Sequence, residues 1–416
     1  MSRRYVMLCF IVFVSAAKAM PEASESPHCA GTEERFSPAR IVTLANGKRY
    51  AIFGTGQGFQ DGSGRAHLFL ESLQAPAETV EIDTGVGHNL GGQCDDVASD
   101  CNALAEVELA DVNGDGMTDW AYAGDLHGNV WAFDLTGEGG ISGITATRLF
   151  TSCGEPLLPG EQCGRAHRQP ITRRVALARN IHLSSRVENP NINVYWGTGL
   201  LRTTDDAVNT SPQAFYSVLH TGQESDASMP AHFHSDLAER TYIALGDGPS
   251  GGYGEARSVN HGDAVDYRGY HGMRQYGWYI SLPELGERVL HRPLVVGDLI
   301  IFTSLVPTLP EPCDDAVASW VNVLSLADGL VPQRLVINNS GGAPVLDYNQ
   351  DGVLDGEDQV ADTTVLSVRI AEGGDPARIE NDKLMLGDTE DSAQVGWRVQ
   401  FDTPSQVGRV GWYQLR

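Results

Sequence analysis

The densest set of potential ligands lies in DVNGDGMTDW, residues 111–120, where oxygen-bearing side chains alternate ahead of Gly116. Alternation lets several side-chain oxygens converge on one point, and the glycine permits the sharp turn that brings them together. Calcium accepts about six to eight oxygen ligands in flexible geometry, whereas magnesium requires a tighter octahedron. We therefore predict a calcium loop, with an Asx-rich turn that holds no metal as the alternative. The expected ligands are Asp111, Asn113, Asp115, the main-chain carbonyl of Met117, and Asp119.

A second stretch, DYNQDGVLDGED at residues 347–358, repeats the pattern with Gly352 at the turn. The two loops begin 236 residues apart (347 minus 111), and chance explains such a recurrence poorly. We therefore predict one or two bound calcium ions. The expected ligands of the second loop are Asp347, Asn349, Asp351, the main-chain carbonyl of Val353, Asp355 and Asp358.

The residues around the first loop indicate what kind of calcium loop it is. An EF-hand places a bidentate Glu at the twelfth position, and that position is Tyr122 here. The flanking segments LAEVELA and WAYAG favour strands over helices. We therefore expect a β-hairpin loop in which Asp119 replaces the missing Glu. In the second loop Asp358 occupies the twelfth position, and the strand-like segment TTVLSVRI follows.

Short apolar or alternating runs recur along the chain between Gly, Asp, Asn and Pro, which is typical of strands joined by tight turns. Two weak repeats organise them: an aromatic-Gly-Thr-Gly tetrad at 53–56 and 196–199, and a strand that runs into a turn at 129–137 and 321–329. Successive four-stranded units predict an all-β protein with a β-propeller over residues 38–416, and a β-sandwich is the alternative. The runs with strand character are Ile41–Leu44, Tyr50–Phe53, Ala66–Leu70, Ala105–Leu109, Trp120–Ala123, Asn129–Phe133, Asn193–Trp196, Trp278–Leu282, Leu299–Thr303, Trp320–Leu326 and Thr364–Ile370.

Three segments depart from this pattern. Residues 221–275, rich in Gly, His and Tyr, and residues 370–395 are expected to be long inserted loops. Residues 235–245 have weak helical character.

The first 19 residues have the three parts of a secretory signal peptide. Arg3 and Arg4 precede the apolar stretch 5–16, and Ala17-Lys18-Ala19 is a small-residue cleavage site. A membrane anchor would need about 20 apolar residues, more than this stretch offers. We expect cleavage after Ala19, export, and a short N-terminal segment at 20–37 ahead of the propeller.

The charge of the mature chain excludes some partners. Cleavage removes three basic residues and no acidic ones, so the net charge becomes 26 minus 54, or −28. Such a balance argues against nucleic acid or an anionic membrane as a partner. No later segment is apolar enough to span a membrane, so we expect no membrane span.

Six cysteines remain after cleavage, and an even number in an exported chain favours disulfides. Six cysteines allow 15 connectivities. Pairs 94–101 and 153–163 close short loops and are the most economical, which leaves Cys29 with Cys313. The spacings are too wide for a zinc site, and no CxxC pair occurs.

The stretch ELADVNGDGMTDWAYAGDLHGNVWAFDLTG, residues 108–137, resembles the C-terminal β-propeller domain of the PilC/PilY family of type IV pilus biogenesis and tip-adhesin proteins. YWGTGLLRTTDDAVNTSPQAFYSV, GERVLHRPLVVGDLIIFTSLVP and GRVGWYQLR are similar to that domain too, and PVLDYNQDGVLDGED resembles its second acidic loop. The resemblance runs discontinuously from about residue 36 to the C-terminus. The long N-terminal region usual in the family has no counterpart in this sequence. The resemblance therefore implies a short variant whose ring is small, open or completed by a second chain.

The resemblance implies a calcium-binding pilus protein without catalytic residues. In that family calcium occupancy opposes pilus retraction, and the protein can sit at the fibre tip as an adhesin. For this chain it implies a role in pilus extension, retraction and twitching motility, with minor pilins and a host surface as partners. It also implies location in the periplasm, at the pilus tip or at the cell surface. Carried over residue by residue, the regulatory ligands are Asp111, Asn113, Asp115, the Met117 carbonyl and Asp119.

Two other function classes stay open. A free-standing secreted adhesin or lectin-like module would share the fold, the calcium loops and export. A quinoprotein-like dehydrogenase would share the blade repeats, but such enzymes often stack their cofactor on a disulfide between adjacent cysteines, and none are adjacent here. The sequence also lacks Gly-x-Ser-x-Gly, His-Glu-x-x-His and P-loop motifs, so we expect no enzyme. His232 and His234, with Asp236, could bind a transition metal, but we expect a surface pair without function.

Overall fold

Strand β7 (Asn129–Asp134) shows the rule by which this fold is built, because its side chains alternate between two cores. In the computed structural model, Trp131 and Phe133 belong to one buried cluster, and Val130 and Ala132 to another. Successive side chains of a strand point to opposite faces, so a strand that is apolar throughout needs a packing partner on both sides. Such strands force sheets to stack on one another.

The structure describes residues 36–56, 62–89, 100–137, 140–183, 190–224, 227–247, 254–307, 318–332, 344–349, 353–370, 377–380, 383–386 and 396–398. All of them belong to one compact unit, Glu33–Arg416. The predicted signal peptide lies outside the described residues.

The strands form four main sheets in which neighbouring strands are antiparallel, except for β12 and β15, which are parallel. The first sheet has the order β1 (Arg40–Thr43), β2 (Arg49–Gly54), β3 (His67–Ser72), β4 (Thr79–Asp83), and the second β5 (Glu108–Ala110), β6 (Trp120–Gly124), β7, β8 (Thr145–Thr151). The third has the order β12 (Ala238–Arg240), β15 (Gly277–Ser281), β11 (Ala214–His220), β10 (Ile192–Gly197), β9 (Ala176–Arg179). The fourth has the order β13 (Tyr242–Asp247), β14 (Glu255–Val259), β21 (Ser367–Ile370), β18 (Ala318–Ser325), β17 (Leu299–Val306), β16 (Leu294–Val296).

Two small sheets and five short helices complete the described structure. The small sheets pair β19 (Gln359–Val360) with β20 (Thr363–Thr364), and β22 (Ala377–Glu380) with β23 (Lys383–Leu386) and β24 (Gly396–Arg398). The helices are α2 (Thr204–Val208), η1 (Gly140–Gly143), η2 (Arg165–His167), η3 (His234–Asp236) and η4 (Gly356–Asp358). None of the helices that the structure describes has the length and apolar character needed to cross a membrane.

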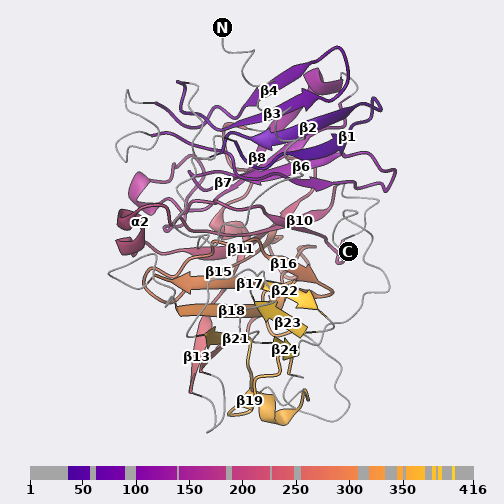
Figure 1. The fold of residues 1–416 in the computed structure, drawn as a ribbon. Coiled ribbons are helices and arrows are strands. Elements are labelled where there is room, and N and C mark those ends of the chain that lie inside the picture. Colours follow the sequence, from indigo (N-terminus) through magenta and orange to yellow (C-terminus); the bar gives the residue numbers. More distant parts are fainter. Residues whose placement is uncertain are drawn as a thin grey trace, which may run out of the picture. The chain divides into compact units, whose positions relative to one another are not determined.

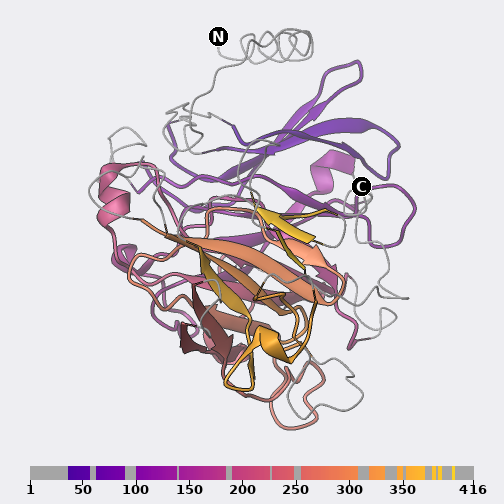
Figure 2. The ribbon, with the colours of Figure 1, turned by 60° about the horizontal axis from the view of Figure 1, so that its bottom comes forward.

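The four main sheets follow one another in chain order, with a hydrophobic cluster between each successive pair (Figure 1). β10 repeats the rule of β7, since Trp196 faces the second sheet and Tyr195 the fourth. The turned view shows the same face-to-face succession, with α2 on a rim (Figure 2). This is the blade packing of a β-propeller. The predicted all-β propeller fold is confirmed, and the strands that the structure describes form an open series of blades rather than a closed ring.

A glycine ends the second strand of each of the first three sheets and lets the chain entering the next sheet approach closely. A Cβ on Gly54 would lie 2.6 Å from the Leu104 carbonyl oxygen, and one on Gly124 would lie 2.2 Å from Ile171 Cγ2. A Cβ on Gly197 would lie 2.4 Å from Val289 Cβ. The sequence repeat at 53–56 and 196–199 therefore marks positions where a residue without a side chain lets neighbouring blades pack closely. Gly124 has the equivalent role in the second sheet, but the tetrad cannot be recognised there because Asp125, not Thr, follows the glycine.

This close approach predicts that Gly197→Ala destabilises the protein by roughly 1–3 kcal/mol, the usual cost of overpacking a core. The measurement is the free energy of unfolding in urea. Gly143→Ala is the matched control, because its Cβ would meet its nearest neighbour at an ordinary 3.7 Å. Equal stability of the two variants would contradict the packing role of Gly197.

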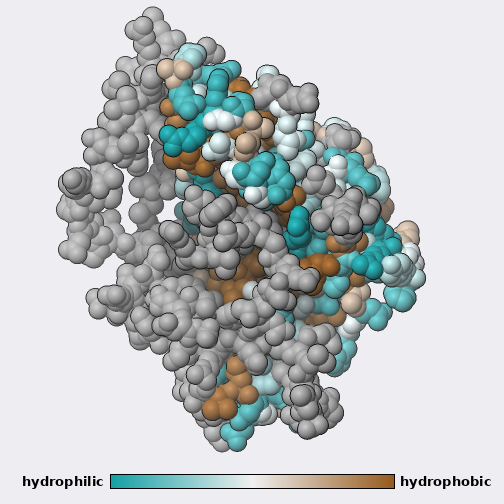
Figure 3. Space-filling model, turned by 90° about the vertical axis from the view of Figure 1, so that its right-hand side faces the viewer, coloured by the Kyte–Doolittle hydropathy of each residue, from teal (hydrophilic) through white to brown (hydrophobic). Residues whose placement is uncertain are grey.

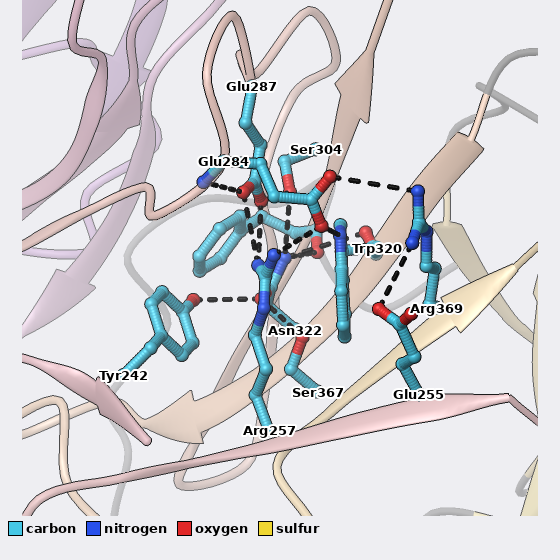
Figure 4. Close-up of polar contacts among 11 residues, drawn as sticks. Tyr242, Glu255, Arg257, Glu284, Glu287, Ser304, Trp320, Asn322, Ser367 and Arg369 are labelled. Carbon is cyan, nitrogen blue, oxygen red and sulfur yellow. Dashed lines mark hydrogen bonds and ion pairs between the residues drawn. The ribbon is translucent and has the colours of Figure 1, made fainter. Parts of the chain in front are cut away.

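A buried ionic network ties the fourth sheet to the turn between β15 and β16 (Figure 4). Arg257 of β14 donates to both carboxylate oxygens of Glu287, at 3.0 and 3.1 Å, and its guanidinium lies 3.4 Å from the ring centroid of Trp320 in β18. Ser304 of β17 donates to Glu287 at 2.6 Å, so the carboxylate is held from two strands. Removing one partner of such a buried pair typically costs about 3–5 kcal/mol. The network is therefore a structural tie.

The predicted strands and one predicted disulfide are confirmed, whereas the predicted insertions are partly wrong. Each predicted run overlaps an observed strand. Residues 221–275 contain β12, β13 and β14, and residues 370–395 contain β22 and β23. In the stretch 235–245 only the end of the short η3 is helical, and β12 and β13 take up most of the rest, because pairing with β15 and β14 overrides a weak local preference.

Cys153 and Cys163 are joined as predicted. Cys101 is also disulfide-bonded, and its predicted partner Cys94 lies outside the described residues, as do Cys29 and Cys313.

Candidate functional site

The first predicted calcium loop is the turn between β5 and β6, so the predicted hairpin is confirmed. Ala110 pairs with Trp120 across the two strands, and the Asp119 amide donates to the Ala110 carbonyl at 2.9 Å. Gly114 and Gly116 have φ values of +78° and +85°, which side chains with a Cβ rarely adopt. The glycines therefore set the curvature of the loop.

The predicted ligand side chains all turn toward the backbone of their own loop. The two carboxylate oxygens of Asp111 accept from the amides of Gly114 and Gly116, at 2.7 and 2.8 Å. Asn113 and Asp115 each accept from the amide two residues ahead, both at 2.8 Å. Asp119 accepts from the Val112 amide at 2.7 Å. The structure thus brings the predicted side chains together around one short turn.

The electrostatics of this turn favour a cation. Burial raises the pKa of Asp119 above its usual value, and the carboxylates of Asp111 and Asp115 raise it further. A carboxylate offers about four lone-pair sites, so oxygens that each accept one N–H retain capacity for a metal. Within the described ranges no three His, Cys, Asp or Glu side chains are already set to hold a metal ion.

The loop is anchored to sheets on both sides of its own. The Thr118 amide donates to the carbonyl of Thr43 at the end of β1, at 2.8 Å. Arg179 of β9 donates to the Val112 carbonyl at 3.3 Å. These anchors are invisible in the sequence, because they lie about 70 residues away and use main-chain atoms of the loop. The loop is therefore the point where the first, second and third sheets meet.

The second predicted loop also folds back on itself at its twelfth position. Asp358 is fully buried and accepts from the amides of Asn349 and Asp355, at 3.2 and 3.0 Å. Burial raises the pKa of Asp358, and Asp347 adds to the rise. Val353 is about half exposed, and Asp351 lies outside the described residues. The described part of the loop has the same features as the first loop: clustered carboxylates that bind their own backbone.

The sequence of the chain also matches a known protein family. Residues 35–243, half of the chain, match the family model of the PilY1 beta-propeller domain. The chain belongs to the PilY1 β-propeller family.

Several PilY1 proteins are similar to the chain. It is 27% identical over 295 residues to the type IV pilus biogenesis factor PilY1 homolog of Xylella fastidiosa, covering 70% of this chain and 18% of that protein. It is 25% identical over 311 residues to the type IV pilus biogenesis factor PilY1 of Pseudomonas aeruginosa PAO1, covering 68% of this chain and 24% of that protein. The chain thus spans about a quarter or less of these two relatives. The crystal structure of the Pseudomonas aeruginosa PilY1 C-terminal domain has the same fold, with a TM-score of 0.61 at 19% identity, covering 88% of this chain and 72% of that one.

The PilY1-type fold buries two histidines that we predicted to lie on the surface. His232 and His234 are each 6% exposed, so that prediction is wrong. The two rings also diverge: His232 bonds Glu224 at 3.1 Å, whereas His234 lies 3.3 Å from the Tyr216 hydroxyl. The reason is that His232 lies beside β8 at the edge of the second sheet, where its amide donates to the Leu149 carbonyl at 3.0 Å. His234, by contrast, begins η3 and is buried in the core.

Glu224 is the centre of a second polar cluster, beside a pocket of about 380 Å³. Its carboxylate accepts from the Thr221 amide and hydroxyl as well as facing His232 and His220. Burial alone would raise the pKa of Glu224, but the hydrogen bond from His232 and the nearby His220 lower it to about 2. His220 in turn contacts the Tyr122 hydroxyl at 2.9 Å and the Trp120 ring. The cluster therefore braces the strand that leaves the first predicted calcium loop.

The buried histidines make stability depend on pH. Burial lowers the pKa of His220 and of His234 to about 4, whereas the unfolded chain titrates near 6.5. Between these values the unfolded state binds more protons, so stability is full above pH 6.5 and falls as the pH drops toward 4. Each histidine contributes a slope of up to about 1.4 kcal/mol per pH unit.

His234→Phe keeps an aromatic ring among Phe150 and Tyr279 but cannot bind a proton. We expect its free energy of unfolding, measured in urea between pH 7 and 4.5, to fall less steeply with acid than that of the wild type. The exposed His261→Phe should leave the slope unchanged. An unaltered slope in His234→Phe would show that His234 binds protons equally in the folded and unfolded states, and would contradict the lowered pKa.

Proposed function

We propose that this chain is an exported, calcium-binding PilY1-type propeller that regulates type IV pilus extension and retraction and contributes to adhesion. It acts by binding rather than by catalysis. Its partners are pilus components such as minor pilins, and a host surface where it serves as an adhesin. It works in the periplasm, at the pilus tip or at the cell surface.

The observation that carries this proposal is the position of the first loop where three sheets meet. Its anchors are the Thr43 carbonyl in the first sheet and Arg179 in the third. A change in the shape of the loop therefore reaches two neighbouring blades. Membership of the PilY1 family and the relatives described as type IV pilus biogenesis factors support the pilus as its setting.

The residues of the loop would respond to calcium in a definite way. Asp111, Asp115 and Asp119 would hold the ion with Asn113 and the Met117 carbonyl. Bound calcium supplies a positive charge that offsets the repulsion among the three carboxylates. Thr118 and Val112 lie between these ligands and carry the contacts to the neighbouring sheets. Ordering of the ligands would therefore fix the packing of those sheets and the surface offered to pilus components.

Calcium binding itself is tested by calorimetry on single variants. Asp115→Asn should weaken one binding event at least tenfold, because it removes a charge from an exposed position without disturbing the core. Asp358→Asn should weaken a second, separate event. Asp205→Asn, an exposed carboxylate on α2, is the control and should bind as the wild type does. Unchanged binding in both loop variants would contradict the calcium sites.

The pilus role is tested in a strain that lacks the gene. We expect fewer surface pili and impaired twitching, both restored by the wild-type chain. A chain carrying Asp115→Asn should restore them without the response to calcium seen with the wild type. Normal piliation and twitching in the deletion strain would contradict the proposed role, whatever the calcium affinity.

A further inference from the structure

The chain displays a second feature that the calcium loops do not explain, the 266–275 loop. Its sequence is DYRGYHGMRQ, and it connects β14 to β15. Large hydrophobic side chains reach the surface at scattered places on the molecule (Figure 3). Met273 and Tyr270 in this loop are 84% and 73% exposed, and they are among the most exposed of them. Ile181, 68% exposed, precedes His182, which this loop contacts.

The loop is rigidly built although its tip is exposed. Its ends are joined, since the Gln275 amide donates to the Asp266 carbonyl and the Asp266 amide donates to the Gln275 side chain, both at 3.0 Å. The Asp266 carboxylate accepts from the His271 amide at 2.6 Å and from the Arg268 amide at 3.3 Å. Compact surface loops whose ends meet in this way are frequently functional.

The exposed Tyr270 side chain is held in place as well. The Arg268 guanidinium donates to the His182 carbonyl at 2.7 Å and to the Tyr270 hydroxyl at 3.3 Å. The same group lies 5.7 Å from the centroid of the Tyr270 ring. An interface residue fixed before binding loses less conformational entropy when a partner arrives. Nothing in the packing of the fold requires Tyr270 or Met273 to stand in solvent.

The composition and charge of the loop indicate the kind of partner. Tyr, Met and Arg are enriched at protein interfaces, and Tyr and Arg dominate binding hot spots. The loop carries two arginines and one aspartate, whereas the chain as a whole has a net charge of −25. Arg268 is exposed, whereas Arg274 has two buried guanidinium nitrogens and lies 4.8 Å from the centroid of the Tyr276 ring. The aspartate is turned inward to the loop amides. An exposed guanidinium, that of Arg268, beside exposed apolar groups fits a hollow lined by apolar residues and rimmed by carboxylates.

We propose that the 266–275 loop is a protein-docking site that inserts Tyr270 and Met273 into an acidic-rimmed hollow on a component of the pilus. The assignment of the partner to the pilus rests on the proposed function. The docking role of the loop rests on its own geometry.

The test measures binding of the purified full chain to type IV pili sheared from the gene-deletion strain, by surface plasmon resonance. Tyr270→Ser/Met273→Ser should weaken binding at least tenfold while leaving the melting temperature unchanged, because both side chains are exposed. Leu285→Ser, 79% exposed on a different turn, is the matched control and should bind as the wild type does. Met273→Glu should bind more weakly than Met273→Lys, because a carboxylate on the loop would meet carboxylates on the rim.

The outcomes separate the two proposals. If the wild type binds pili and the double variant binds equally well, the docking role is overturned and the pilus role stands. If the wild type does not bind pili at all, the pilus role fails together with this choice of partner. Equal binding of Met273→Glu and Met273→Lys would contradict the proposal that carboxylates surround the hollow on the partner. If light scattering shows that the wild type is a dimer and the double variant is not, the partner of the loop is a second copy of the chain, and the assignment to a pilus component is overturned.

Discussion

The structure depends on one constraint: its central strands are apolar on both faces and must be buried on both. β7 places Trp131 and Phe133 in one core and Val130 and Ala132 in the next, and β10 repeats the arrangement. Each sheet therefore needs a neighbour on either side, and a series of stacked blades results. The glycines at the strand ends let the connecting chain enter the next blade without forcing the sheets apart.

The same constraint decides where function can lie. Since packing occupies most of the sheet faces, clusters of carboxylates gather in turns at the rims, and both acidic loops are such turns. The first loop is also attached to the sheets on either side, through Thr43 of the first sheet and Arg179 of the third. Its clustered carboxylates repel one another, and burial makes the charge on Asp119 costly. A cation that relieves this repulsion would act on three blades at once.

Much of this fold and part of the candidate site could be predicted from the sequence, and the reasons are physical. Alternation and turn residues are local properties, so the strands, the hairpin around 111–119 and the Cys153–Cys163 pair could be predicted. Tyr122, at the twelfth position of the first loop, has its side chain buried against His220. Contacts between blades are not local, so Arg179 could not be linked to the loop. Strand pairing likewise overrode the weak helical pattern at 235–245, and burial of His232 and His234 depends on neighbours distant in the chain.

The central claim is that the first calcium loop fixes the packing of the sheets it joins. Amide hydrogen exchange with and without calcium tests this most directly, because it reports local opening segment by segment. The Tyr348 hydroxyl of the second loop donates to the Gly254 carbonyl beside β14, so the measurement uses the Asp358→Asn variant, whose second loop is impaired. In this variant the account predicts that calcium slows exchange in 111–120 and also in β1 and β9, while β14 in the fourth sheet exchanges at the same rate. Protection confined to 111–120, or no protection, would contradict it.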